Sequence, residues 1–359
     1  MLISKSAENK NKVMPKIAAA TERSDWVDYA KAIGIILVVY GHVVRGLIKA
    51  DLINNEQLYQ TIDSVIYTFH MPLFFFLSGL FFQSSLSRRG GRRLIYSKLD
   101  TIIYPYILWS LLQGGAELIM SDFTNGNIQP SEVLSIWVPR AQFWFLFVLF
   151  ITFIASTIYT LIFRELFNSF LLMTSAAAYL YHPDNLPTPL IQLCENLVFF
   201  SIGISFTRHN IPEKLNSTYS LLLMLLTFIG LQYVFHNILG KTYMDKGVDS
   251  LLLATLSIAL VTSISTTIPS NSLGFLRTIG QFSMAIYLIH ILSGSGARVI
   301  LSKILGIDSE ELHITAGLLS GILIPIIIAK LAQRHGINYL FSAPLSKWLT
   351  LPLKTPKNT

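Results

Sequence analysis

The chain has 359 residues, of which 52% are hydrophobic and only 13% charged, and its mean hydropathy is +0.54. Because soluble domains contain about a quarter charged residues, this composition excludes an ordinary soluble protein and predicts an all-α polytopic membrane protein. The net charge of +7 fits basic residues that face an anionic leaflet, so we expect the lipid bilayer, and no nucleic acid, as a partner.

Residues 1–25 are polar and basic and contain no apolar stretch before a cleavage-like site, which favours a cytoplasmic tail over a secretory signal. Ten apolar segments follow that are long enough, or nearly so, to cross a hydrocarbon core about 30 Å thick. These segments are 29–49, 64–86, 100–120, 141–163, 166–182, 190–207, 217–238, 250–269, 279–301 and 313–333. They predict one membrane domain of ten helices over 26–336.

The remaining residues, 337–359, contain an apolar stretch that Pro344, Lys347 and Pro352 interrupt. Such interruptions favour an interfacial C-terminal segment over a further span. With the N-terminus inside, 19 Lys and Arg residues fall on the cytoplasmic side and six on the outer side. This asymmetry follows the positive-inside rule and predicts an even number of spans with both termini cytoplasmic.

Metal and disulfide chemistry are not expected. Cys194 is the only cysteine, which excludes an intramolecular disulfide and a thiolate metal cluster. Neither a His-x-x-x-His pattern nor a carboxylate pair occurs at the spacing of metal ligands, so we predict no metal.

The first apolar segment contains two ionisable residues in an unusual arrangement. Lys31 and His42 are eleven positions apart, which is three helical turns, so they share one face with a height difference of about 16 Å. Asp28 precedes Lys31 by three residues and could pair with it. Ionisable groups inside a membrane are costly and usually mark a pathway or a reaction centre. The alternatives are a His42 that is hydrogen-bonded to a neighbouring helix and a Lys31 that snorkels to the headgroups.

The spacing from Lys31 to His42 resembles the Arg/Lys-ten-residues-His signature of the acyltransferase-3 family, which are integral membrane O-acyltransferases. Three further stretches are similar to motifs of that family in the same order: His-Met-Pro-Leu-Phe-Phe-Phe-Leu-Ser-Gly at 70–79, Phe-Trp-Phe-Leu at 143–146, and Ser-Met-Ala-Ile-Tyr-Leu-Ile-His at 283–290. The resemblance spans nearly the whole chain. It implies transfer of an acyl group, most simply acetyl, from cytoplasmic acyl-CoA to a carbohydrate hydroxyl in a bacterial inner membrane. Polysaccharide assembly machinery is a further partner that it suggests.

The donor, acetyl-CoA, is expected to bind at the cytoplasmic side. Its phosphates suit the basic run outside the third segment, so Arg92, Arg93 and Lys98 are the candidate contacts, together with Lys31 and Ser78. Many family members have arginine where Lys31 stands, and many have two arginines three apart at the third helix. Arg89 and Arg92 have that spacing but lie early, which leaves open which basic residue binds phosphate.

The acceptor is expected to approach from the other side, where polar residues of several segments should lie at a similar depth. The candidate acceptor-binding residues are His70, Glu117, Trp144, Glu195 and Arg298. For each of them a local structural hydrogen bond is an equal alternative, and Trp144 suits an interfacial anchor as well as a sugar-stacking surface.

The candidate catalytic residues are Asp28, His42, Tyr287 and His290. His42 would act either as the general base for the sugar hydroxyl or as a nucleophile that becomes acylated. Ser78, Tyr287 and His290 are candidate donors to the oxyanion, although Tyr287 and His290 could instead lock helix packing.

Two other classes of function remain open at this point. Polar groups inside a helical bundle also suit a transporter or flippase for polysaccharide precursors, and a non-catalytic membrane subunit could use the same fold. Labelled acetyl-CoA separates these classes, because only the enzyme should both bind it and transfer the label.

Overall fold

The structure is a computed structural model that describes residues 25–121, 128–183, 185–208, 218–270 and 272–349. The predicted N-terminal tail therefore lies outside the described residues. Across the described ranges every regular element is a helix, and eight helical stretches are long and apolar enough to cross a membrane. This confirms the prediction of an all-α polytopic membrane protein.

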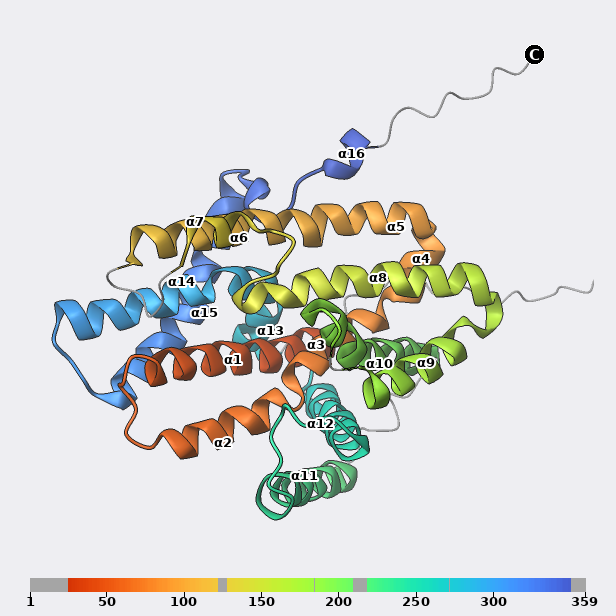
Figure 1. Ribbon diagram of the computed structural model, residues 1–359, viewed down its shortest axis with the longest axis horizontal. Helices are drawn as coiled ribbons and strands as arrows, with labels where there is room; N and C mark the ends of the chain where they lie inside the picture. The colour runs from red at the N-terminus through yellow and green to blue at the C-terminus, as the bar shows by residue number, and fades with distance from the viewer. Residues whose placement is uncertain (1–24, 122–127, 184, 209–217, 271, 350–359) are drawn as a thin grey trace, which may run out of the picture.

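The ten predicted segments correspond to helices, although not one to one with the eight long stretches. One stretch, Ala141–Tyr181, reverses at Arg164, whose φ of 45° marks the turn between α8 (Trp144–Phe163) and α9 (Phe167–Tyr181). The segment predicted at 100–120 forms α6 (Tyr104–Ile119), which at 16 residues is shorter than the roughly 20 needed for a span. It continues α5 (Gly91–Lys98) through the π-helical turn η1 (Leu99–Ile103). Together they form one long rod in Figure 1.

Helix α1 (Asp25–Ile48) lies in the middle of the bundle (Figure 1). Asp25 and Asp28 occupy its first turn and Arg45 its last turn, which complements the helix dipole. Its 24 residues span about 36 Å, enough to cross the membrane. The helices that pack against it are α3 (His70–Leu80), α12 (Val248–Thr267), α13 (Gly274–Gln281), α14 (Ser283–Val299) and α15 (Glu310–Arg334). The polar residues of α1 are therefore surrounded by protein.

The segment predicted at 64–86 lies within the apolar stretch Glu56–Arg89, but the helix there is broken. The chain there forms α2 (Glu56–Tyr67), α3 (His70–Leu80) and α4 (Phe82–Arg89), with a break at Thr68 and Phe69. Pro72 lies in the first turn of α3, where a missing amide N–H costs nothing because that group has no intrahelical partner. A helix that continued through Pro72 would instead lose a hydrogen bond, so the sequence favours a new start at this point.

Three glycines allow two pairs of helices to approach closely. A Cβ on Gly79 of α3 would overlap the backbone of Phe200, and one on Gly203 would overlap the backbone of Phe76. The pair brings α3 against α10 (Thr188–Arg208), as small residues do in membrane helices. Gly280 of α13 similarly meets the backbone of Asp28. These contacts fix α3 beside α10 and α13 beside α1.

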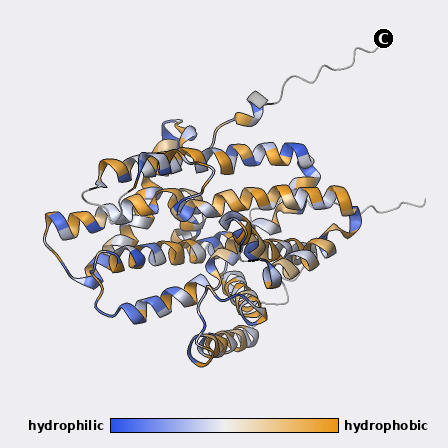
Figure 2. Cartoon of the chain, in the orientation of Figure 1, coloured by the Kyte–Doolittle hydropathy of each residue, from blue (hydrophilic) through white to orange (hydrophobic). Residues whose placement is uncertain are grey.

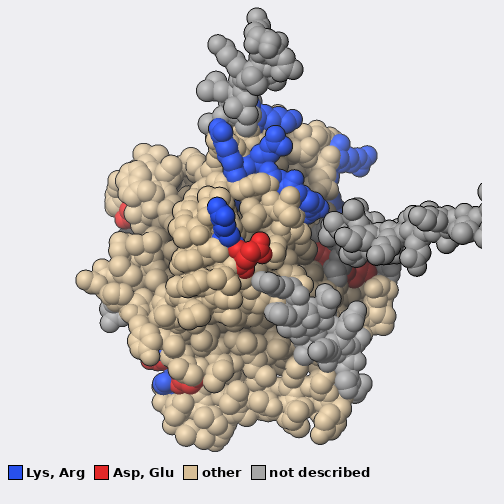
Figure 3. Space-filling view, turned by 90° about the vertical axis from the view of Figure 1, so that its right-hand side faces the viewer, with Lys and Arg blue, Asp and Glu red and all other residues tan. Residues whose placement is uncertain are grey.

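The outer surface of the bundle is apolar. Helix α11 (Thr218–Tyr233) packs mainly on α12 and exposes Leu222, Leu226 and Ile229, and orange ribbon dominates the long helices in Figure 2. Basic side chains instead gather at one end of the bundle, the right-hand end of Figure 1, which Figure 3 views directly. The exposed arginines of α4 and α5 are Arg88, Arg89, Arg92 and Arg93.

The predicted interfacial segment packs against the α5–α6 rod. Ser346, in α16 (Leu345–Leu349), donates its amide to Asp100 over 2.7 Å, and the Trp109 indole donates to the Leu340 carbonyl over 2.7 Å. Residues 350–359 lie outside the described residues. The remaining short elements are α7 (Pro130–Leu134), η3 (Ala141–Phe143), η4 (Arg164–Leu166), η6 (Val234–Ile238), η7 (Ile300–Ile304) and η8 (Asn338–Leu340).

Candidate active site

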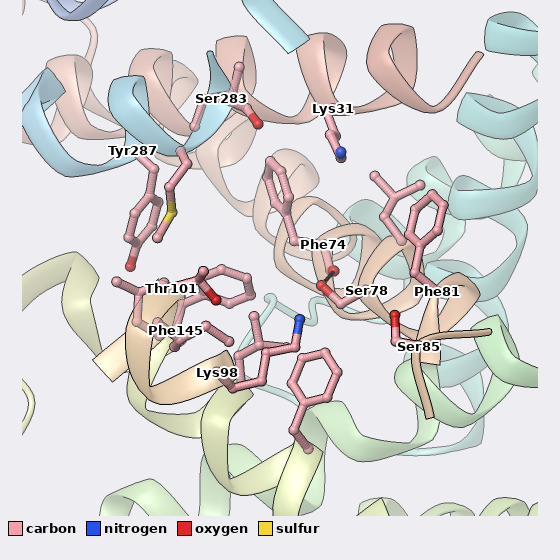
Figure 4. A pocket seen from close by; sticks show the side chains of 17 residues that line it. Lys31, Phe74, Ser78, Phe81, Ser85, Lys98, Thr101, Phe145, Ser283 and Tyr287 are labelled. Carbon is pink, nitrogen blue, oxygen red and sulfur yellow. Dashed lines mark hydrogen bonds between the residues drawn. The ribbon is translucent and has the colours of Figure 1, made fainter. Parts of the chain in front are cut away.

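A cavity of about 450 Å³, which we call the lysine cavity, opens among α1, α3, α8, α14 and the start of the α5–α6 rod. Its walls are mostly aromatic and aliphatic, with Lys31 and Lys98 as the charged groups among its lining residues. Figure 4 shows the two ammonium groups entering the same space from opposite helices. The hydroxyl-bearing residues that line it are Ser78, Ser85, Thr101, Ser283 and Tyr287.

The two lysines are held differently. The Lys31 Nζ lies 3.9 Å from Asp28 Oδ1, which is the predicted pairing, and Asp28 itself is buried. The Lys98 Nζ lies 4.1 Å from the centroid of the Phe153 ring, a cation–π contact. No carboxylate is among the residues that line the cavity. The lysine cavity is thus an apolar chamber with two positive charges, which suits a ligand that is apolar along its length and anionic at one point.

A second cavity of about 790 Å³, the histidine cavity, lies toward the other end of α1. The residues that line it and are polar or aromatic include His42, Arg45, Lys49, Asp63, Tyr67, Trp144, Tyr243, His290 and Arg298. Aromatic rings and charged side chains line this cavity together, whereas the walls of the lysine cavity are mostly apolar. Such a lining suits a hydroxyl-rich ligand, which needs many hydrogen-bond partners and flat apolar faces.

His42 and His290 meet in the wall of the histidine cavity, with ring centroids 5.1 Å apart. The Nδ1 atom of His290 lies 3.0 Å from the Ile286 carbonyl oxygen and 2.9 Å from that of Tyr287. Because a carbonyl only accepts hydrogen bonds, Nδ1 must hold the proton, which leaves a lone pair on Nε2. That Nε2 atom is buried and has no hydrogen-bond partner among the described residues. His290 Nε2 is therefore a hydrogen-bond acceptor on the ring that lies beside His42.

The residues of the histidine cavity that were not predicted from the sequence include Arg45, Asp63, Tyr67 and Tyr243. Arg45 donates to Asp63 Oδ2 from Nε over 2.9 Å and from Nη2 over 2.7 Å, and its guanidinium lies 3.6 Å from the centroid of the Tyr67 ring. The Tyr243 ring contacts the Tyr67 ring at an interplanar angle of 50°, with centroids 4.8 Å apart, and the Tyr243 amide donates to the Ser64 hydroxyl. The spacing of three between His42 and Arg45 could have identified Arg45. Nothing local identifies the other three, because their segments meet only in the folded bundle.

Neighbouring residues on two helices line the two cavities. Phe145 lines the lysine cavity and its neighbour Trp144 lines the histidine cavity. On α14, Tyr287 lines the lysine cavity and His290, one turn later, lines the histidine cavity. The Tyr287 hydroxyl donates to the Gln142 carbonyl, so this tyrosine also ties α14 to the start of α8.

The structure brings together eight of the predicted site residues. Lys31, Ser78, Lys98 and Tyr287 line the lysine cavity, and His42, Trp144, His290 and Arg298 line the histidine cavity. Ser78 donates its hydroxyl to the Phe74 carbonyl over 2.8 Å.

The other predicted residues lie elsewhere. Arg92 and Arg93 are exposed on α5, and neither lines a cavity. His70 is buried, with Nδ1 2.9 Å from the Ile66 carbonyl oxygen. Arg92 and Arg93 therefore remain at the basic end of the bundle, whereas the His70 ring contacts the ring of Tyr67 in the histidine cavity, with centroids 4.3 Å apart.

Two predicted carboxylates also lie apart from the histidine cavity. Glu195 lies 3.8 Å from the ammonium of Lys246, which is in the loop before α12. Burial lowers the pKa of Lys246, and the negative charge of Glu195 offsets part of this effect. Glu117 binds Arg140 over 2.6 Å and lines a third cavity of about 440 Å³, which we call the arginine cavity. The expectation that both carboxylates converge with His42 is not met in the structure.

No cluster of three or more His, Cys, Asp or Glu side chains that could hold a metal occurs in the described ranges.

Comparison with known proteins places this geometry in a family. Residues 24–330 match the family model of the acyltransferase domain. Nodulation protein NolL of Sinorhizobium fredii (strain NBRC 101917 / NGR234) is 27% identical over 206 residues, which are 56% of this chain and 53% of the relative. Nodulation protein NolL of Mesorhizobium japonicum is also 27% identical over 206 residues, at 53% and 50% coverage.

The chain thus spans about half the length of the curated relatives it matches. No solved structure matches it. Because the family model covers most of the chain, from before α1 to near the end of α15, this membrane protein belongs to the acyltransferase-3 family.

Proposed function

We propose that this protein is a membrane O-acyltransferase that moves an acyl group, most simply acetyl, from acyl-CoA to a hydroxyl of an extracytoplasmic or lipid-linked carbohydrate. The observation that supports this most strongly is the pair of cavities with contrasting chemistry that are lined by neighbouring residues of α8 and α14. A transferase with two substrates from opposite sides of a membrane needs such an arrangement.

The donor is proposed to enter the lysine cavity from the basic end of the bundle. The exposed arginines of α4 and α5 mark that end (Figure 3) and favour a cytoplasmic location under the positive-inside rule. With this orientation both termini are cytoplasmic, as in a bacterial inner membrane. Lys31 and Lys98 would bind phosphate as point charges, and the apolar walls would enclose the pantetheine arm with its thioester toward the wall.

The acceptor is proposed to occupy the histidine cavity with one hydroxyl at His42. In the direct route, His42 takes the hydroxyl proton as the oxygen attacks the thioester carbonyl. A C–O bond forms, the C–S bond breaks, and the CoA thiolate takes up the proton as it leaves. In the two-step route, His42 first accepts the acyl group and then passes it to the sugar. Either route requires a neutral imidazole, and the adjacent His290 provides a buried hydrogen-bond acceptor for the same reaction centre.

The test compares acetylation of the exported polysaccharide by proton NMR in cells that express wild type, His42→Ala or His335→Ala. His335 is the matched control because it is exposed at the end of α15. We expect His42→Ala to remove the acetate signal and His335→Ala to retain it, at equal protein levels in the membrane. Acetate that persists in His42→Ala would refute the proposal. Purified protein that neither binds nor transfers label from acetyl-CoA would favour a transporter instead.

A further inference from the structure

The C-terminal segment packs on the outer face of the rod that carries Lys98. Helix α16 contacts both α5 and η1, and α8 contacts η1 as well. In Figure 1 the rod lies between α16 and α8. Lys98 is the last residue of α5, and it lines the lysine cavity together with Thr101 and Ile102 of η1. One face of this short stretch therefore forms a wall of the cavity, while another face meets the C-terminal segment.

The sequence explains why the rod is not a regular α-helix at this point. Pro105, in the first turn of α6, has no amide N–H to donate to the Thr101 carbonyl, as a continuous α-helix would require. The turn widens instead, and the Tyr104 amide donates to the Leu99 carbonyl, five residues back. Such π-helical turns are rare overall and frequent at functional sites. Because the regular hydrogen-bond ladder is interrupted there, contacts from outside the rod can decide how the turn is oriented.

Asp100 of η1 makes such contacts. One oxygen of its carboxylate accepts the Ser346 amide over 2.7 Å, and the other accepts the Ser346 hydroxyl over 2.5 Å. The Asp100 backbone carbonyl accepts the Ala343 amide over 3.4 Å. Further along the rod, the Trp109 indole donates to the Leu340 carbonyl. Residues 340–346, which we call the C-terminal strap, are thus attached to the rod both at η1 and on α6.

The side chains of Lys98 and Asp100 point in nearly opposite directions. Two residues along a helix correspond to a rotation of about 200°. Accordingly, the Lys98 ammonium points into the lysine cavity, 4.1 Å from the centroid of the Phe153 ring, whereas the Asp100 carboxylate contacts the strap (Figure 4). A rotation of the turn that moved Asp100 away from Ser346 would therefore also move Lys98 out of its place in the cavity.

We propose that Asp100 and Ser346 are positioning residues for donor binding, because the C-terminal strap holds η1 in the rotation that directs the Lys98 ammonium into the lysine cavity. Neither residue lines the cavity, so both act through Lys98. The inference rests on the proposed function only in naming acyl-CoA as the ligand of Lys98. The orientation of Lys98 is a property of the free protein and is measured without any ligand.

The first experiment follows Lys98 by NMR in the full chain in lipid nanodiscs, after reductive methylation of its lysines with isotope-labelled formaldehyde. Methylation keeps the positive charge, and the methyl resonance of Lys98 is identified by its absence in Lys98→Arg. In wild type we expect the ring current of Phe153 to displace this resonance from those of exposed lysines. Asp100→Ala should return it to their position, and Asp100→Asn, which preserves size, should move it part of the way.

Two matched variants control this measurement. Ser346→Thr keeps the amide and the hydroxyl and should leave the Lys98 resonance in place, whereas Ser346→Ala should shift it. Glu165→Ala removes a carboxylate from η4, where Glu165 is exposed, and should have no effect. A wild-type resonance that is not displaced, or one that stays in place in both Asp100 variants, overturns the inference.

The second experiment measures transfer from acetyl-CoA on the same preparations. Asp100→Ala should raise the donor KM about fivefold with kcat unchanged. In a Lys98→Gln background it should raise the donor KM no further, because both residues act through the same ammonium. Equal rises in the two backgrounds overturn the inference. A Lys98 resonance that moves in Asp100→Ala while the donor KM stays constant refutes donor binding at Lys98 and not the action of the strap on its orientation.

Discussion

Replacing Lys98 by glutamine tests how the lysine cavity binds its donor. Among the described residues that line this cavity, Lys98 and Lys31 are the charged ones, and Asp28 pairs with Lys31 from outside the lining. A charge-assisted hydrogen bond to phosphate contributes about 1.5–3 kcal/mol. In the free protein the Lys98 ammonium already contacts the Phe153 ring at 4.1 Å, an interaction of about 0.5–2 kcal/mol that must be exchanged on binding. The net loss is then about 1–1.5 kcal/mol, or roughly tenfold in affinity.

The assay is steady-state transfer from acetyl-CoA by purified protein at saturating acceptor. We expect Lys98→Gln to raise the donor KM about tenfold and to change kcat little, because Lys98 lines the cavity away from the His42 wall. Arg92→Gln is the control: Arg92 is exposed, and its Nε donates to the Tyr96 hydroxyl over 3.2 Å. An unchanged KM in Lys98→Gln, or an equal rise in Arg92→Gln, would refute the assignment of phosphate binding to the cavity.

Four further predictions concern the wall and the helices around it. His290→Asn keeps a side-chain N–H donor but removes the Nε2 acceptor. We therefore expect kcat to fall about 10²-fold or more with KM unchanged, and a variant with the wild-type kcat would contradict this. Phe145→Ala thins the wall between the cavities, so thiol-release assays should show more acetyl-CoA hydrolysis per transfer, and an unchanged ratio would be evidence against the wall. Gly203→Val places a side chain against the Phe76 backbone, so the thermal midpoint in detergent should drop by several degrees, and an unaltered midpoint contradicts the close packing. Glu195→Gln should change the acceptor KM by no more than about twofold, since Glu195 lines none of the three cavities. A large rise in the acceptor KM would show that Glu195 contacts the acceptor.

Some features of the site could be predicted from sequence because they depend on one helix at a time. Hydropathy located the helices, since a membrane span must be apolar over about 20 residues. Helical periodicity put Lys31 and His42 on one face, and the structure has them lining two cavities that meet. The break before α3 was missed, although Pro72 is its visible local cause.

The sequence by itself determined how far apart two residues lie along one helix, because that distance follows from 1.5 Å of rise per helical residue. It did not determine which residues of different helices face one another. Glu195 and His42 were expected at similar depth, yet Glu195 contacts Lys246 while His42 contacts His290. Only the tertiary structure decided this, because the lateral position and rotation of each helix follow from contacts between distant segments, such as Gly79 against Gly203.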